Sequence, residues 1–165
     1  MVKVSNFSIT ELYEGQSFSF DTKISEAMVD TFAKLTGDVS PLHMDHNFAT
    51  RRGFKSRVTH GALLFGLVSR LIGVHLPGRD CLLHSMNIKY PMPTYANDLV
   101  RTRGTIEQIS IGARVMTLQI EIFVMPGVQK KMASGRECWL PCRLSHPANS
   151  GARYLDRSLY SGFDE

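Results

Sequence analysis

The stretch GDVSPLHMDH, which begins at Gly37, follows directly on a segment with the apolar periodicity of a helix. Gly37 is a helix stop, because glycine readily takes the left-handed conformation that ends helices. Pro41 cannot continue a helix and biases the residue before it toward an extended conformation. Together they predict a stiff bend that presents Asp38 and His43 from irregular backbone, where functional side chains are commonly found.

Two other interpretations of this stretch stay open at the level of sequence. In the first, Asp38 caps a following short helix and His43 is a partly buried packing residue. In the second, His43, Asp45 and His46 are metal ligands, although so short a window rarely closes a site without a distant ligand. The loose candidates for that ligand are Asp80 and His84. We therefore predict that the site holds no metal.

The segments on either side of this stretch show the apolar spacing of helices or the alternation of strands. Ser25 is a candidate N-cap for a helix over 26–36, and residues 17–24 have the alternation of a short strand. Residues 60–75 are apolar on nearly every side, which is typical of a buried helix. Four further strands are predicted at 81–90, 99–110, 113–125 and 129–139. This order predicts an α+β domain in which an antiparallel sheet packs on one long helix.

The size and composition of the chain fit one domain. Its 165 residues are 43% hydrophobic, enough to bury a core. We place the domain at residues 1–144 and a C-terminal tail, flexible or docked, at 145–165. The longest apolar run, 61–76, is too short and too polar to cross a bilayer, so no membrane association is expected.

Charge and cysteine content narrow the classes of partner and compartment. The net charge of +4 is scattered, and only residues 51–57 concentrate it. No RNA-binding signature or basic heptad accompanies that cluster, so we expect no nucleic-acid partner. Three cysteines form neither a disulfide framework nor a zinc ribbon, which favours reduced thiols and a cytoplasmic protein.

A second motif opens the buried helix at His60-Gly61. A glycine at that point lets a ligand approach free backbone N–H groups, which carry the positive end of the helix dipole. The motif therefore predicts a site for an anion or an oxyanion. For Gly66, further along the helix, we expect only a close approach of helix to sheet.

The two motifs together resemble the MaoC-like hydratases and dehydratases of the hotdog fold, and in particular the (R)-specific enoyl-CoA hydratases. The family signature, an acidic or Gly-Asp pair followed by x-Asn-Pro-Leu-His, is matched by residues 37–43, and His-Gly then opens the central helix, with a serine later in it. Leu-Pro-Gly at 76–78 leads into the sheet as it does in the family. The resemblance covers residues 18–140 and implies a single hotdog domain. Ser40 departs from the family, which usually has Asn there.

The resemblance implies a catalytic role for four positions. Asp38 and His43 would activate water, and the backbone N–H of Gly61 would bind the thioester oxygen. Ser69 would support Asp38 and His43 without contacting the substrate. The implied reaction is the reversible hydration of trans-2-enoyl-CoA to (R)-3-hydroxyacyl-CoA, with no cofactor. We assign substrate binding to Ser40, Pro41 and His60, and contact with CoA phosphates to Arg51, Arg52, Lys55 and Arg57.

The resemblance also implies partners and leaves rival functions. The family forms homodimers, with the active site at the subunit boundary, and the acyl carrier is CoA or an acyl-carrier protein. One rival is a 3-hydroxyacyl-carrier-protein dehydratase of fatty acid or polyketide synthesis, which uses the same residues. The other is a non-catalytic acyl-CoA-binding hotdog protein.

Overall fold

The structure is a computed structural model that describes residues 3–125 and 131–136. Its helices are α1 (Glu26–Thr36), α2 (Pro41–Met44), α3 (His46–Arg51), α4 (Gly61–Arg70) and a π-helical turn, η1 (Leu71–His75), that continues α4. Its strands are β1 (Ser17–Lys23), β2 (Asn87–Lys89), β3 (Leu99–Ser110), β4 (Val115–Met125) and β5 (Lys131–Arg136).

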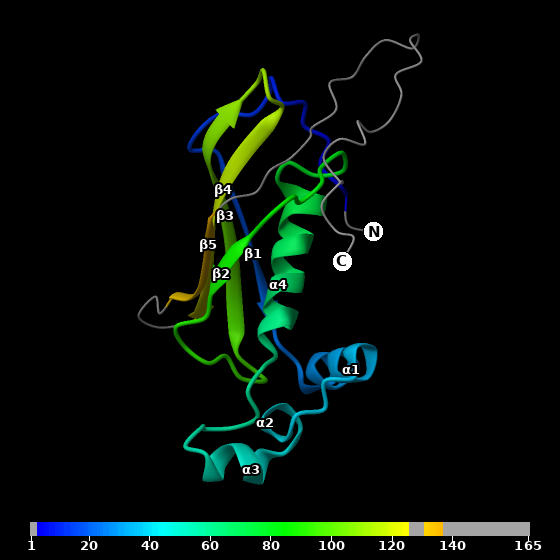
Figure 1. The fold of residues 1–165 in the computed structure, drawn as a ribbon, viewed down its shortest axis with the longest axis vertical. Helices are drawn as coiled ribbons and strands as arrows, with labels where there is room; N and C mark the ends of the chain where they lie inside the picture. Colours follow the sequence, from blue (N-terminus) through cyan, green and yellow to red (C-terminus); the bar gives the residue numbers. More distant parts are fainter. Residues whose placement is uncertain (1–2, 126–130, 137–165) are drawn as a thin grey trace, which may run out of the picture.

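The five strands form one antiparallel sheet in the order β1-β3-β4-β5-β2. The longest pair is the β3–β4 hairpin, in which Thr102 lies opposite Ile122. Helix α4 runs along one face of this sheet, while α1, α2 and α3 lie beyond the N-terminal end of α4 (Figure 1). The predicted α+β architecture, a sheet around one long helix, is confirmed.

Alternation along the strands produces the core. In β4, Met116, Leu118, Ile120 and Ile122 are buried, and the residues between them are only partly covered. They pack with the buried face of the central helix, whose members are Leu64, Leu67, Val68, Leu71 and Ile72. Burial of one such side chain contributes about 1.5–3 kcal/mol, so this interface fixes the helix on the sheet.

Close approach of helix to sheet depends on a different glycine from the one we predicted. A Cβ added at Gly104 of β3 would lie 2.5 Å from Leu71 Cδ2, so any larger residue there would displace Leu71 from its packing on the sheet. Gly66 has open space around its Cα and is exposed. The interpretation of Gly66 as a contact with the sheet was therefore wrong.

Local signals placed the first helix correctly. The Ser25 hydroxyl accepts a hydrogen bond from Met28 N–H at 3.2 Å, as an N-cap does. Gly37 takes a φ of 76° and donates its N–H to Ala33 O at 2.8 Å, which ends α1. Asp38 therefore lies directly after the end of a well-capped helix.

Other segments differ from the prediction. Residues 38–51 are not wholly irregular, because they contain α2 and α3. Residues 81–86 form no strand, and the strand predicted at 81–90 shrinks to β2. The last strand is described only at Lys131–Arg136, and both the boundary at residue 144 and the tail at 145–165 lie outside the described residues.

Across 3–125 and 131–136, none of the helices combines the length and the apolar character needed to cross a bilayer.

Candidate active site

His43 lies on the one-turn helix α2, with its ring orientation fixed by a backbone acceptor. Its Nδ1 is 2.7 Å from Val58 O. A carbonyl oxygen only accepts, so Nδ1 must carry the proton and donate it. The Nε2 atom of neutral His43 therefore keeps its lone pair, which is the form that a general base requires.

Asp38 lies three residues before the start of α2, and its carboxylate is half-exposed. Oδ1 accepts a hydrogen bond from Ser40 N–H at 3.3 Å, and Asp38 N–H donates to Thr36 Oγ1 at the same distance. The first bond orients the carboxylate, and the second holds the backbone of Asp38 just beyond the end of α1. In this place the carboxylate can accept a proton from a bound water.

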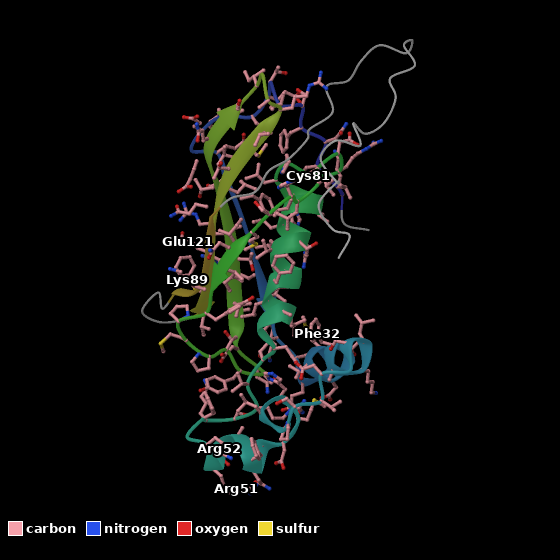
Figure 2. The ribbon with its side chains drawn as sticks, viewed as in Figure 1. Phe32, Arg51, Arg52, Cys81, Lys89 and Glu121 are labelled. Atoms are coloured by element: carbon pink, nitrogen blue, oxygen red, sulfur yellow. The ribbon has the colours of Figure 1, made fainter. Side chains whose placement is uncertain are left out.

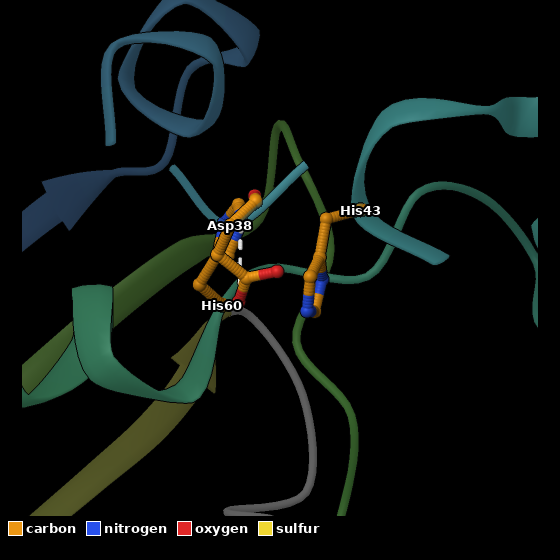
Figure 3. A group of neighbouring side chains, drawn as sticks. All are labelled: Asp38, His43 and His60. Atoms are coloured by element: carbon orange, nitrogen blue, oxygen red, sulfur yellow. Dashed lines mark hydrogen bonds and ion pairs between the residues drawn. The ribbon is translucent and has the colours of Figure 1, made fainter. Parts of the chain in front are cut away.

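His60 is the N-cap residue of α4, and its side chain is only 2% exposed. Its Nε2–H donates to Asp38 O at 3.0 Å and lies 3.9 Å from Asp38 Oδ2. Its ring stands 3.9 Å from the His43 ring, centroid to centroid, and 5.0 Å from that of Phe32. Figure 3 shows the three polar side chains gathered at one point. The prediction that His60 binds substrate meets a side chain that is buried against Asp38 and His43.

The three side chains can also be considered as metal ligands. One ligand atom from each of Asp38, His43 and His60 lies within 4.8 Å of the other two. This group differs from the alternative that the sequence left open, in which Asp45 was a ligand. Asp45 instead caps α3, because its Oδ1 accepts a hydrogen bond from Phe48 N–H at 3.0 Å.

Gly61 begins α4, where helix geometry leaves its N–H without an intrahelical acceptor. The ring of Tyr90 packs over it so closely that an added Cβ would lie 3.2 Å from two ring carbons. The Tyr90 hydroxyl donates to Gly61 O at 2.9 Å. Burial raises the pKa of the Tyr90 phenol, so the group stays protonated and able to donate at neutral pH.

A cavity of about 320 Å³ lies beside His43, Gly61 and Tyr90. Its lining residues are His43, Phe54, Val58, Thr59, Gly61, Leu64 and 90–94. Thr59 N–H donates to Thr94 O at 2.7 Å, which connects two of its walls. The lining is mainly apolar, with His43 and the N-terminus of α4 on one side, so the cavity suits an uncharged chain that carries a polar reacting group.

The four predicted cations separate into two pairs. Arg51, the last residue of α3, and Arg52, its C-cap, are exposed at the end of the molecule away from the β3–β4 turn (Figure 2). The Arg52 guanidinium lies 5.3 Å from the Phe48 ring. Lys55 pairs with Asp98 at 3.4 Å and lies over the Tyr95 ring. Arg57 is mostly buried and pairs with Asp30 and with the backbone of His43. The last two are therefore engaged within the chain.

Like Asp38 and His60, the three remaining predicted residues lie outside the cavity lining. Ser40 is the N-cap residue of α2 and Pro41 its first residue, and both are exposed. Ser69 is exposed on the last turn of α4, eight residues beyond Gly61. At 1.5 Å per residue this is about 12 Å along the axis, so within one chain Ser69 is separated from Asp38 and His43.

Sequence reasoning did not identify Tyr90 as part of the site. The only signal was its position directly before Pro91-Met92-Pro93, where a strand must end. Nothing local indicates that this turn folds back over the N-terminus of α4, because the contact joins residues 29 positions apart. The sheet brings them together.

Comparison with known proteins agrees with this geometry. The family model of the MaoC like domain matches residues 10–122. An (R)-specific enoyl-CoA hydratase of Aeromonas caviae is 30% identical over 120 residues, which are 73% of this chain and 90% of that protein. An (R)-specific enoyl-CoA hydratase of Rhodospirillum rubrum is 33% identical over 96 residues, 58% of this chain and 67% of that protein.

Solved structures lead to the same group. An (R)-hydratase from A. caviae superposes with a TM-score of 0.71 at 29% identity, over 76% of this chain and 93% of that one. The family match spans well over half of the chain and contains both Asp38-x-x-x-x-His43 and His60-Gly61. The chain therefore belongs to the MaoC-like family of hydratases and dehydratases and has its hotdog fold.

Proposed function

We propose that this protein is a hydro-lyase that adds water reversibly to trans-2-enoyl-CoA and forms (R)-3-hydroxyacyl-CoA. The observation that carries the proposal is the meeting of Asp38 with His43, which lines a cavity together with Gly61, the first residue of α4. The (R) configuration follows the names of the two relatives described above.

The carboxylate and the imidazole divide the proton transfers. A water held between Asp38 and His43 Nε2 loses a proton to this pair as its oxygen bonds to C3 of the enoyl group. The electron pair of the C2–C3 double bond moves toward the thioester oxygen and forms an enolate. The proton then returns from the pair to C2, on the face from which the water came. Addition is therefore syn, and each step reverses in dehydration.

The N-terminus of α4 stabilises the intermediate charge. The thioester oxygen, bound at Gly61 N–H, becomes more negative as the enolate forms, so this hydrogen bond is stronger in the transition state than in the ground state. One such donor is commonly worth about 3 kcal/mol. The helix dipole acts in the same direction.

The test is the loss of enoyl absorbance when purified protein meets crotonyl-CoA, followed by chiral analysis of the product. Rapid formation of (R)-3-hydroxybutyryl-CoA supports the proposal. A protein that binds crotonyl-CoA without hydrating it is the non-catalytic alternative. Faster turnover of the same acyl group on acyl-carrier protein than on CoA would identify the dehydratase alternative.

Ser40→Asn is expected to leave the protein folded and to move kcat/KM by no more than about tenfold, which is roughly 1.4 kcal/mol. Ser40 is exposed, and its N–H, not its side chain, holds the Asp38 carboxylate. Steady-state kinetics on crotonyl-CoA check this. An inactive wild type that gains hydratase activity from the change would indicate a lineage that has given up catalysis.

We propose further that the reaction needs no metal and no redox cofactor, because proton transfer and hydrogen bonding supply every step. Exhaustive dialysis against EDTA is then expected to leave kcat unchanged. Loss of activity that Zn²⁺ restores would instead make Asp38, His43 and His60 a metal site.

We propose a cytoplasmic homodimer, the assembly that the family resemblance implies. Of the described strands, β1 and β2 stand at the ends of the sheet, and an end strand can pair with a second copy. Multi-angle light scattering at micromolar concentration is expected to give twice the chain mass of 18.5 kDa. A mass equal to one chain would contradict the dimer.

A further inference from the structure

The guanidinium of Arg57 lies between α1 and the turn that carries His43. Its Nε donates to His43 O at 2.7 Å, and a terminal nitrogen forms an ion pair with Asp30 of α1. The same terminal nitrogen lies 4.0 Å from Met44 Sδ. Only 15% of the Arg57 side chain is exposed, which leaves it little surface for a ligand.

The next residue holds the same turn from a second side. Val58 N–H donates to Leu42 O at 3.1 Å, and Val58 O accepts the Nδ1–H of His43 at 2.7 Å. The dipeptide Arg57-Val58 thus makes three hydrogen bonds to Leu42-His43. A one-turn helix has almost no stability of its own, so these bonds must fix α2 and the direction of the His43 ring.

We propose that Arg57 is a positioning residue for His43, held in turn by Asp30, and not a contact for the phosphates of CoA. This rests on the function proposed above, in which His43 Nε2 exchanges a proton with water. Displacement of a reacting group by about 1 Å can cost roughly a hundredfold in rate. Arg57 acts through the backbone carbonyl of His43 and does not touch the substrate.

Arginine suits this position better than lysine. Its planar guanidinium presents several N–H donors in fixed directions, so it can serve a carbonyl and a carboxylate at once. A lysine would keep one charged contact, with either Asp30 or His43 O, and would lose the fixed geometry. Asp30 compensates the charge that Arg57 brings into a mostly buried place.

The experiment compares Arg57→Gln, Arg57→Lys and Asp30→Asn on crotonyl-CoA. Arg57→Gln is expected to lower kcat by roughly 10- to 100-fold while KM stays within about threefold. Arg57→Lys should recover part of the loss, and Asp30→Asn should give a smaller loss of the same kind. The matched control is Arg101→Gln, which breaks the exposed pair with Asp21 on the sheet and should leave kcat unchanged.

The second readout is a double-mutant cycle with His43→Ala. If Arg57 acts through His43, Arg57→Gln should cost less than about twofold in kcat once the imidazole is gone. An equal cost in both backgrounds overturns the proposal, as does a raised KM with unchanged kcat. If Arg57→Gln does not fold, Arg57→Lys and Asp30→Asn carry the same comparison.

An NMR measurement separates this proposal from the proposed function. The Nδ1 proton of His43 should exchange slowly with water in the wild type and in Arg101→Gln, and rapidly in Arg57→Gln. Slow exchange in all three overturns the positioning role. A wild type that hydrates no enoyl thioester but shows this pattern would remove the proposed function and leave the contact between Arg57 and His43 supported.

Discussion

Asp38→Asn is expected to lower kcat on crotonyl-CoA by at least about a hundredfold, since general acid–base groups commonly contribute that much. Asparagine keeps the shape of the side chain and an oxygen that accepts the Ser40 N–H, and Asp38 O still accepts from His60. The fold and the placement of the loop should therefore persist. What is lost is the negative charge and the ability to take a proton from water.

The control is Asp45→Asn, on the same stretch of chain. The Asp45 carboxylate caps α3, and asparagine caps a helix about as well as aspartate. Its kcat should stay within about twofold of the wild type. Initial rates and thermal unfolding curves for both variants check this. Turnover like the wild type's in Asp38→Asn would rule out the assignment of Asp38.

His43→Ala is likewise expected to lower kcat at least about a hundredfold. The change removes Nε2, the atom that exchanges a proton with water, and leaves Val58 O without the Nδ1–H donor. An unmade hydrogen bond at a partly buried carbonyl costs about 1–3 kcal/mol, so some loss of stability should accompany the loss of rate. Stopped-flow absorbance and thermal unfolding separate the two effects.

His46→Ala is the matched control, because His46 lies three residues further along and is exposed on α3. Its ring contacts Ser56 at 3.4 Å and does not line the cavity. Its kcat should therefore be unchanged. If His43→Ala were folded and as fast as His46→Ala, the proton transfers could not pass through the imidazole.

The elements that the sequence determined are those whose signals lie within a few residues of one another. A cap at Ser25 and a stop at Gly37 define α1, and alternation defines β3 and β4. Apolar residues on nearly every side of the segment that forms α4 and η1 identified the central helix. These features depend on hydrogen bonds and side-chain directions within one element, so they can be read without knowing the neighbours.

Short motifs that resemble those of a known family also identified Asp38, His43 and Gly61 as candidate site residues. The sequence did not reveal α2 and α3, because helices of one or two turns are too short to show periodicity. It also extended β2 backwards over residues 81–86, which form no ladder with the described strands. A strand needs a neighbour to accept its hydrogen bonds, which only the sheet supplies.

Only the tertiary structure showed what the remaining residues contact. His60 was expected to bind substrate but is buried beneath Asp38, while Arg57 pairs with Asp30, 27 positions away. The ring of Tyr90 reaches Gly61 across 29 positions. In each case the side-chain type suits both a ligand contact and an internal one. For His60 and Arg57 burial favours the internal contact, because a polar group removed from water must find its partner within the protein.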